Sequence, residues 1–367
     1  MNNIIIHLVA GARPNFMKIA PLYHALSKED WADPQIVHTG QHYDFDMSDS
    51  FFRDLQLPDP TYHLGAGGGS HGEQTAEIIK KYEALCLENP PGLVIVVGDV
   101  NSTMGCAISA KKLCLPVAHL EAGLRSGDRT MPEEINRLIT DSISDYLWTP
   151  SPDADAHLLA SGVDKDSICL VGNIMIDAYE MLSGSIASYD LVEQLGLSSQ
   201  DYGLVTLHRP SNVDDRDKLG ALVDGLLEAS KSLPLVFSVH PRTRERLVTF
   251  GLMKKLEDEA RIELLGPQNY IGFMNLVMNS RAVITDSGGI QEETTYLGIP
   301  CLTLRDNTER PITIDRGTNT LVSVDTFLEK LKAVLASPMP GRLQIENWDG
   351  NTASRVVDCI RKIAKSI

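Results

Sequence analysis

The chain has 367 residues, of which 43% are hydrophobic, and its 33 basic and 49 acidic side chains give a net charge of −16 at pH 7. This length exceeds one ordinary core and this composition is too apolar for disorder, so we expect two globular domains. The acidic balance, with no long Lys or Arg run, argues against nucleic acid or an anionic membrane as a partner.

Cysteine usage and the first residues bear on the compartment. The six cysteines are scattered, without a C-x-x-C pair or a His cluster at zinc spacing, which predicts free thiols, a reducing cytoplasmic location and no metal site. The apolar start Ile4–Ile6 has no basic stretch before it and runs into Gly11-Ala12-Arg13-Pro14, so we expect a strand rather than a signal peptide. A run of about 18 apolar residues, which a membrane span needs, is absent from the sequence.

Short apolar runs alternate with helix-length segments along the chain, a pattern typical of α/β proteins with parallel sheets. The predicted strands are residues 4–10, 35–39, 93–97, 116–120 and 167–171 in the first half, and 204–207, 235–239, 282–285 and 300–304 in the second. Helices are expected at 103–113, 218–232 and 292–297, and a glycine-rich mobile loop at 65–72. This predicts two Rossmann-like domains, residues 1–171 and 172–350, with an amphipathic helix in 351–367 that packs back on the first.

Ligands of parallel sheets bind beyond the carboxyl ends of the strands, so the residues that follow each apolar run are the candidates. After the first run, Arg13 and Lys18 flank Pro14, which opens a helix. Two cations beside free backbone N–H groups suit a phosphate or a developing anion. A plain turn with solvated charges is the alternative, and this motif alone does not decide between them.

Three acidic residues follow three successive elements of the first half: Asp99, Glu121 and Glu133. Each has a structural alternative. Asp99 could cap the next helix, buried Glu121 would need a cation such as Arg125 or Arg137, and Glu133 stands four residues before Arg137. These alternatives do not predict three acids converging from three elements, which favours a catalytic carboxylate cluster.

The second half carries features that suit a nucleotide. Residues 285–293 read as a strand end, a turn with Ser287, Gly288 and Gly289, and the start of a helix. The glycines would let backbone amides approach a diphosphate, and Glu293, one helical turn later, could accept hydrogen bonds from ribose hydroxyls. A single turn of this kind is a weak signal.

Charged and titratable residues follow the remaining strands. Residues 305–311 combine two arginines, Arg305 and Arg310, with two acids, a density that a plain surface does not explain. His208 and His240 each follow a predicted strand. A single histidine is more often structural than catalytic, and for these two both readings stay open.

Taken together, these segments resemble the non-hydrolysing UDP-N-acetylglucosamine 2-epimerases, which share the two-domain fold of GT-B glycosyltransferases, with the domains facing a cleft. The resemblance runs in order along nearly the whole chain. Its segments are GARPNFMKIAPL at 11–22, TGQHYD at 39–44, VVGDVNST at 96–103, HLEAGLRS at 119–126, MPEEINR at 131–137, VGNIMIDA at 171–178, VTLHRPSN at 205–212, TDSGGIQEE at 285–293 and RDNTERP at 305–311.

The resemblance implies an activity: reversible inversion of C2 of UDP-N-acetylglucosamine, by loss of UDP to 2-acetamidoglucal and its return. It implies no cofactor, and it suggests a homodimer. It assigns catalytic roles to Asp99, Glu121, Glu133 and His208. It places Glu293 at the ribose, Phe273 under the uracil, and four residues at the diphosphate: Arg13, Ser287, Gly288 and Gly289. It also places Lys18, Arg137 and Arg310 along the same site and His240 among the residues that contact UDP-sugar.

The sequence departs from the best-known bacterial pattern in three places. Asn15 replaces the usual acid after Arg-Pro, and the segment between Arg125 and Glu133 is shorter and lacks the usual Trp. Many bacterial members are activated by a second UDP-sugar; Gln41, His42 and His240 match that site, but residues 70–73 lack its arginine. Such activation is therefore not expected here.

Four alternatives stay open at this point. Two are sister activities on the same scaffold: a hydrolysing 2-epimerase that releases free N-acetylmannosamine, and a 2-epimerase for a modified sugar such as a diacetamido uronic acid. A GT-B glycosyltransferase would need an acceptor site, for which the sequence shows no docking face. A non-catalytic UDP-sugar sensor would have no reason to keep Asp99, Glu121, Glu133 and His208 together.

Overall fold

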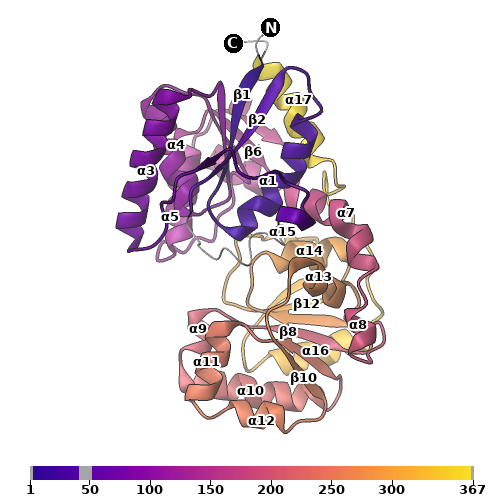
Figure 1. Ribbon diagram of the computed structural model, residues 1–367. Helices are drawn as coiled ribbons and strands as arrows, with labels where there is room; N and C mark the ends of the chain where they lie inside the picture. The colour runs from indigo at the N-terminus through magenta and orange to yellow at the C-terminus, as the bar shows by residue number, and fades with distance from the viewer. Residues whose placement is uncertain (1–2, 41–51, 365–367) are drawn as a thin grey trace. The chain divides into compact units, whose positions relative to one another are not determined.

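Two α/β units make up the chain, each with its own parallel sheet, as Figure 1 shows. This computed structural model describes residues 3–40 and 52–364, except for the side chains of Arg13 and Ala364. The predicted ligand contact of Arg13 and the segment with Gln41 and His42 therefore lie outside the described part. The first unit comprises Met1–Leu182 with Glu346–Ile367, and the second comprises Ser183–Ile345.

The first unit contains a seven-stranded parallel sheet in the order β3-β2-β1-β4-β5-β6-β7. Helices α3, α4 and α5 cover one face, and α1 and α17 cover the other (Figure 1). The strands are β1 (Ile4–Ala10), β2 (Ala32–His38), β3 (Tyr62–His63), β4 (Leu93–Val97), β5 (Val117–Leu120), β6 (Tyr146–Thr149) and β7 (Ile168–Leu170). The helices are α1 (Arg13–Leu26), α3 (His71–Glu88), α4 (Asn101–Lys112), α5 (Pro132–Ile143), α6 (Pro152–Ala160), α7 (Ile174–Ala187), α17 (Thr352–Ala364) and the 3₁₀ turn η1 (Lys165–Ser167).

The second unit contains a six-stranded parallel sheet in the order β10-β9-β8-β11-β12-β13. A hydrophobic core lies between this sheet and four helices, α10, α11, α12 and α16. The strands are β8 (Gly203–Thr206), β9 (Leu235–Ser238), β10 (Ile262–Leu265), β11 (Ala282–Thr285), β12 (Cys301–Leu304) and β13 (Asn319–Val322). The helices are α8 (Leu191–Gln194), α9 (Pro210–Val213), α10 (Arg216–Ser230), α11 (Pro241–Thr249), α12 (Met253–Glu257), α13 (Tyr270–Met278), α14 (Ile290–Leu297), α15 (Ile312–Asp315) and α16 (Phe327–Ala336).

Strand order locates the candidate sites. Both sheets follow the Rossmann order, in which the chain moves outward from a central strand, returns, and continues on its other side. The point of return lies between β1 and β4 in the first sheet and between β8 and β11 in the second. The carboxyl ends of these central strands are where such sheets bind ligands. The prediction of two Rossmann-like parallel-sheet domains is confirmed.

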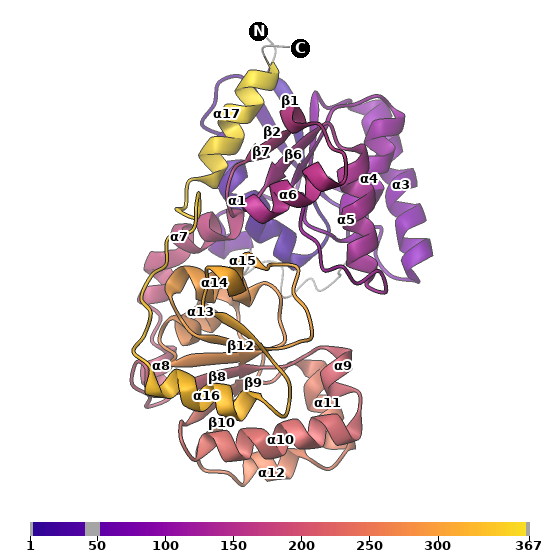
Figure 2. The ribbon, with the colours of Figure 1, turned by 180° about the vertical axis from the view of Figure 1, so that it is seen from behind.

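The last helix belongs to the first unit. Helix α17 packs against α1, as both views of the ribbon show (Figure 2). The Asp177 carboxylate on α7 accepts hydrogen bonds from the backbone N–H groups of Thr352 (3.1 Å) and Ala353 (2.8 Å) at the start of α17. Because α7 supplies this cap, its first half stays with the first unit, and the boundary falls after Leu182 rather than at residue 171.

Several elements differ from the sequence-based expectation. Strands β3, β6, β10 and β13 were not predicted, because their residues do not form a continuous apolar run. The expected glycine-rich loop is shorter than 65–72, since Ser70 caps α3: its Oγ accepts from the Glu73 N–H, and the Glu73 carboxylate accepts from the Ser70 N–H. No helix among the described residues is long and apolar enough to cross a membrane.

Candidate active site

The turn after β1 is fastened to the end of β4 by one side chain. Oδ1 of Asn15 accepts hydrogen bonds from the N–H groups of Gly11 (3.2 Å) and Ala12 (2.9 Å), and its Nδ2 donates to the Val97 carbonyl (3.1 Å). An ionised aspartate could accept the first two bonds but could not donate the third. The unusual residue at this position therefore joins two strand ends and leaves the site without one negative charge.

Glu121, directly after β5, is buried with a lysine as its partner. Nζ of Lys18 lies 2.5 Å from Oε2 of Glu121, and only 8% and 4% of the two residues are exposed. The cation that holds this oxygen is thus Lys18 rather than Arg125 or Arg137, the two that the sequence suggested for a structural pairing. Gly98 makes the approach possible, because a Cβ there would lie 2.9 Å from the Lys18 Nζ.

The second carboxylate oxygen of Glu121 has a different environment. Oε1 is buried and has no hydrogen-bond partner among the described residues. The backbone of Glu121 is held at φ +70°, a left-handed conformation that costs a non-glycine residue energy and occurs often at functional sites. A buried, unpaired acceptor on a strained residue is costly for a purely structural side chain.

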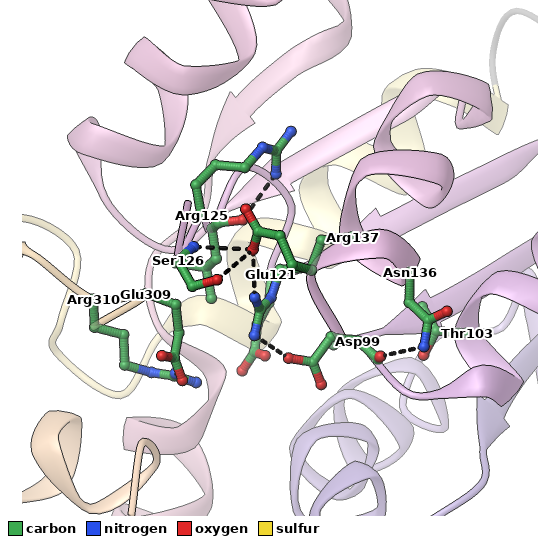
Figure 3. A network of polar contacts seen from close by, with 12 residues as sticks. Asp99, Thr103, Glu121, Arg125, Ser126, Asn136, Arg137, Glu309 and Arg310 are labelled. Atoms are coloured by element: carbon green, nitrogen blue, oxygen red, sulfur yellow. Dashed lines mark hydrogen bonds and ion pairs between the residues drawn. The ribbon is translucent and has the colours of Figure 1, made fainter. Parts of the chain in front are cut away.

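Asp99, after β4, is paired with Arg137 of α5, as Figure 3 shows. Nη2 of Arg137 lies 2.5 Å from Oδ2 of Asp99, and its Nη1 lies 2.7 Å from Oε2 of Glu134. Asn136 donates to the Asp99 carbonyl at 2.9 Å. Burial raises the pKa of Glu134, but hydrogen bonds from Ser126 and the Arg137 guanidinium outweigh burial and lower it. One arginine thus holds the carboxyl groups of two residues from different elements.

For Asp99 and Glu133 the structure differs from the structural alternatives. Helix α4 begins at Asn101 with Val100 at its N-cap, so Asp99 does not cap it. Glu133 lies half-buried on the first turn of α5, but the ion pair of Arg137 within that helix is with Glu134, three residues away. Glu134 could not be singled out from the sequence, because spacing along a helix does not distinguish it from the adjacent Glu133 as the partner of Arg137.

A buried histidine and aspartate join the turns that carry Asp99 and Glu121. Nδ1 of His119 lies 2.6 Å from Oδ1 of Asp141, and its Nε2 lies 2.8 Å from the Gly98 carbonyl. Asp141 also accepts from the Gly123 N–H and from Arg125. Burial raises the pKa of Asp141, but His119 and Arg125 outweigh burial and lower it. The two ring nitrogens of His119 thus bridge the Asp141 carboxylate and the Gly98 carbonyl.

In the second unit, His208 follows β8 and rests on a buried acid. Its Nδ1 lies 3.0 Å from Oδ1 of Asp286, which is fully buried at the end of β11. Asp286 also accepts from the N–H groups of His208 and Arg209 and from Nδ2 of Asn212. This carboxylate fixes the His208 ring, of which 38% stays exposed.

His240, the second candidate histidine, has a structural role. Its Nδ1 accepts from the Arg242 N–H at 3.2 Å and so caps α11. Burial and the neighbouring His208 lower its pKa. The two rings lie 5.5 Å apart between centroids, so His240 caps a helix and also borders the His208 ring.

The serine-glycine turn stands between β11 and α14. Ser287 donates its N–H to Oγ1 of Thr285, and neither glycine has a positive φ. A Cβ at Gly288 would clash with the Glu309 carboxylate, whereas a Cβ at Gly289 would meet open space. Close approach, rather than backbone conformation, therefore requires a glycine at position 288. Gly289 leaves the start of α14 accessible to a ligand.

Glu293 and Phe273, the expected ribose and uracil contacts, lie on α14 and α13. Tyr270, also on α13, donates its hydroxyl hydrogen to Oε1 of Glu293 at 2.7 Å. Burial raises the pKa of Glu293 to about 7, although the Tyr270 bond opposes this rise. Phe273 is half-buried.

The cations at 305–311 are matched by acids. Arg310 forms ion pairs with Glu292 (2.8 Å) and Glu309 (2.6 Å), and Arg305 forms one with Glu309 (2.9 Å). The charge density noted in the sequence is thus a buried network at the start of α15 rather than a set of surface charges.

Comparisons with known proteins give matches along most of the chain. A family model described as UDP-N-acetylglucosamine 2-epimerase matches residues 24–361. The chain is 42% identical to a UDP-N-acetylglucosamine 2-epimerase of Methanocaldococcus jannaschii, over 90% of this chain and 91% of that one. It is 37% identical to a UDP-2,3-diacetamido-2,3-dideoxy-D-glucuronate 2-epimerase of Pseudomonas aeruginosa, over 97% and 99%. A crystal structure of a Methanocaldococcus jannaschii UDP-GlcNAc 2-epimerase with UDP-GlcNAc and UDP matches with a TM-score of 0.89 and 38% identity, over 98% of this chain and 100% of that one.

Proposed function

Because this chain belongs to the UDP-N-acetylglucosamine 2-epimerase family, we propose that it interconverts UDP-N-acetylglucosamine and UDP-N-acetylmannosamine without hydrolysis. The observation that carries the proposal is Glu121, which has one carboxylate oxygen paired with Lys18 and the other buried without a described partner. The reaction needs a carboxylate that is desolvated, fixed and open to a proton from the substrate.

The chemistry explains why several acids are needed. The C2 proton of an acetamido sugar is barely acidic, so its removal is coupled to loss of UDP from C1. A base takes the C2 proton, the electrons of the C2–H bond form a C1–C2 double bond, and the C1–O bond breaks with its electrons on UDP. Return of UDP to C1, with a proton added to the opposite face of C2, gives the epimer. Two proton-handling groups on opposite faces are required.

We assign this proton transfer to Asp99, Glu121 and Glu133, with His208 as a further catalytic group. Asp99 and Glu121 are each held by one cation, which fixes the position of the carboxylate. His208 is oriented by buried Asp286 while its ring stays accessible. Carboxylates that interact share their protons, so the assignment is to the set.

UDP is assigned to the second unit. The turn Ser287–Gly289 and the start of α14 suit the diphosphate, and Glu293 suits the ribose hydroxyls. Phe273 is assigned to the uracil, and His240 is assigned to a contact with the sugar nucleotide. The charge of the leaving group is assigned to Arg13, Lys18, Arg137 and Arg310. We also propose a homodimer, on the family resemblance alone, and a cytoplasmic location, which the scattered cysteines suggest. Light scattering of the purified protein tests the dimer.

Proton NMR in D₂O with UDP-N-acetylglucosamine and no added cofactor tests the reaction. We expect the C2 proton signal to disappear while UDP-N-acetylmannosamine accumulates. Free sugar plus UDP would instead identify a hydrolysing enzyme. Asp99→Asn should keep UDP binding and lose about 100-fold or more in turnover, whereas the exposed Glu77→Gln should change neither.

The second candidate substrate is a UDP-2,3-diacetamido uronic acid, because the Pseudomonas aeruginosa relative covers 97% of this chain at 37% identity. The discriminating measurement is the ratio of kcat/KM for the two sugar nucleotides in the same assay. A ratio that favours the diacetamido uronate would replace the substrate proposed above while leaving the epimerase chemistry in place.

A further inference from the structure

Two cysteines far apart in the sequence touch in the first unit. Cys169 lies in β7, the edge strand of the seven-stranded sheet, and Cys359 lies in α17. Their Sγ atoms are 3.0 Å apart, although 190 positions separate them in the chain. Both residues are partly exposed, so a small reagent can reach them.

The other four cysteines have different environments. Cys86, Cys106 and Cys301 are buried, and burial raises the pKa of each thiol, which makes them poor nucleophiles. Cys114 is exposed and has no sulfur partner within the described residues. The pair therefore stands apart in combining access with a neighbouring thiol.

The charges around the pair separate its two members. The hydrogen bond from Cys359 lowers the pKa of Cys169 to about 7; burial opposes this, and the positive charge of Lys362 assists it. The same hydrogen bond, together with burial, raises the pKa of Cys359. At neutral pH a substantial part of Cys169, about half, is thus the nucleophilic thiolate, and Cys359 lies beside it to resolve an adduct.

We propose that Cys169 and Cys359 form a reversible disulfide that fastens α17 to the edge of the first sheet when the protein meets a low-molecular-weight disulfide. The Cys169 thiolate attacks one sulfur of the reagent, breaks its S–S bond and releases one thiolate. The Cys359 thiol then loses its proton to solvent, and its sulfur attacks Cys169 and releases the second thiolate. Two protein thiols are oxidised and one small disulfide is reduced to two thiols.

A disulfide between Cys169 and Cys359 would add to the polar contacts that hold the returning chain beside β7. Asn347 donates to the Leu170 carbonyl at 3.1 Å, and Arg355 donates to the Val171 carbonyl at 3.2 Å, so the returning chain already borders the end of β7. A covalent link between residues so far apart in sequence removes much of the freedom of the unfolded chain. Oxidation would therefore protect α17 from fraying and stabilise the first unit.

The test is oxidation of the purified full-length protein with oxidised glutathione, followed by intact mass and non-reducing peptide mapping. We expect loss of two hydrogen atoms, a linked pair of peptides that contain Cys169 and Cys359, and reversal by dithiothreitol. The melting temperature should rise by about 5 °C or more, and hydrogen exchange in 352–364 should slow at least tenfold.

Matched variants separate this disulfide from general thiol reactivity. Cys114→Ser should behave like the wild type, whereas Cys359→Ser should keep a stable glutathione adduct on Cys169 and gain no thermal stability. A stable adduct on wild-type Cys169, or a disulfide that involves another cysteine, would overturn the proposal. An unchanged exchange rate in 352–364 after the linkage has formed would refute the fastening of α17. None of these outcomes depends on the epimerase activity.

Discussion

The buried pair Lys18–Glu121 offers the sharpest test of how the site is held together. In Lys18→Met, a side chain of similar length that carries no charge replaces the cation, and Glu121 is left buried without its partner. The two atoms of the pair lie 2.5 Å apart, and fewer than one tenth of either residue is exposed, so solvent cannot replace the lost interaction. We expect a large loss of stability in the first unit.

The size of this loss follows from the cost of an unpaired buried charge. Removal of one partner of a buried ion pair costs about 3–5 kcal/mol, whereas exposed pairs are worth about 0–1 kcal/mol. For a unit of this size, about 4 kcal/mol corresponds to a fall in melting temperature of about 8–16 °C. The double variant Lys18→Met/Glu121→Gln removes the charge as well, so it should recover about 2 kcal/mol of that loss.

Tryptophan fluorescence is a suitable assay because the three tryptophans of the chain, Trp31, Trp148 and Trp348, all belong to the first unit. Urea unfolding of the wild type, the two single variants and the double variant gives the coupling energy directly. Lys80→Met is the matched control, because Lys80 lies 3.8 Å from Glu77 and is 79% exposed. A coupling energy near zero, or an equal loss in Lys80→Met, would refute the reasoning.

Three further variants test the two units. Because burial raises the pKa of Glu293 from 4.5 to about 7, wild-type stability falls as pH rises through that window. Glu293→Gln should therefore be more stable than the wild type by up to about 3 kcal/mol in free energy of unfolding at pH 8, and by little at pH 4.5. Unfolding followed by circular dichroism measures this difference, and a difference that does not depend on pH would contradict the reasoning. Gly123→Ala and Gly127→Ala both place a side chain at positive φ, but only the new methyl group at position 123 also meets a carbonyl oxygen of α6. Gly123→Ala should therefore lose about 2 kcal/mol more of the free energy of unfolding, measured in urea. Equal losses in the two variants would exclude the clash. Burial raises the pKa of Asp286, but the hydrogen bond and charge of His208, with bonds from Asn212 and Arg209, outweigh burial and lower it. The stability that the ionised Asp286 contributes is therefore lost as pH falls through the lowered pKa. Asp286→Asn should be less stable than the wild type at pH 7, and the difference in stability should become smaller in acid; a difference that grows would contradict this.

The strand pattern could be predicted from sequence for strands that are continuous apolar runs buried on both faces. The apolar run that forms β4 is fully buried, and its prediction matches the strand to the residue. Strand β13 reads Asn-Thr-Leu-Val at the edge of its sheet, where partial exposure relaxes the need for apolar residues. Sequence patterns therefore fail first at sheet edges.

Partner choice in the site could not be predicted, for a different reason. Lys18 and Glu121 are 103 positions apart, and only the strand order β1-β4-β5 places them side by side. Arg125 lies nearer to Glu121 along the chain but bonds Asp141 instead, because Asp141 anchors the turn that follows β5. Spacing identified the residue types of the site, and topology decided which of them pair.

The pairing bears on how so acidic a chain can hold a diphosphate. Lys18 is matched by Glu121, Arg137 by Asp99 and Glu134, and Arg310 by Glu292 and Glu309, so cations that the family resemblance assigns to UDP already have carboxylate partners. A diphosphate at these cations would compete with the carboxylates rather than fill a positive surplus. A carboxylate that loses part of its cation becomes a stronger base. If the proposed function holds, binding of UDP therefore has to weaken ion pairs that hold these carboxylates in place.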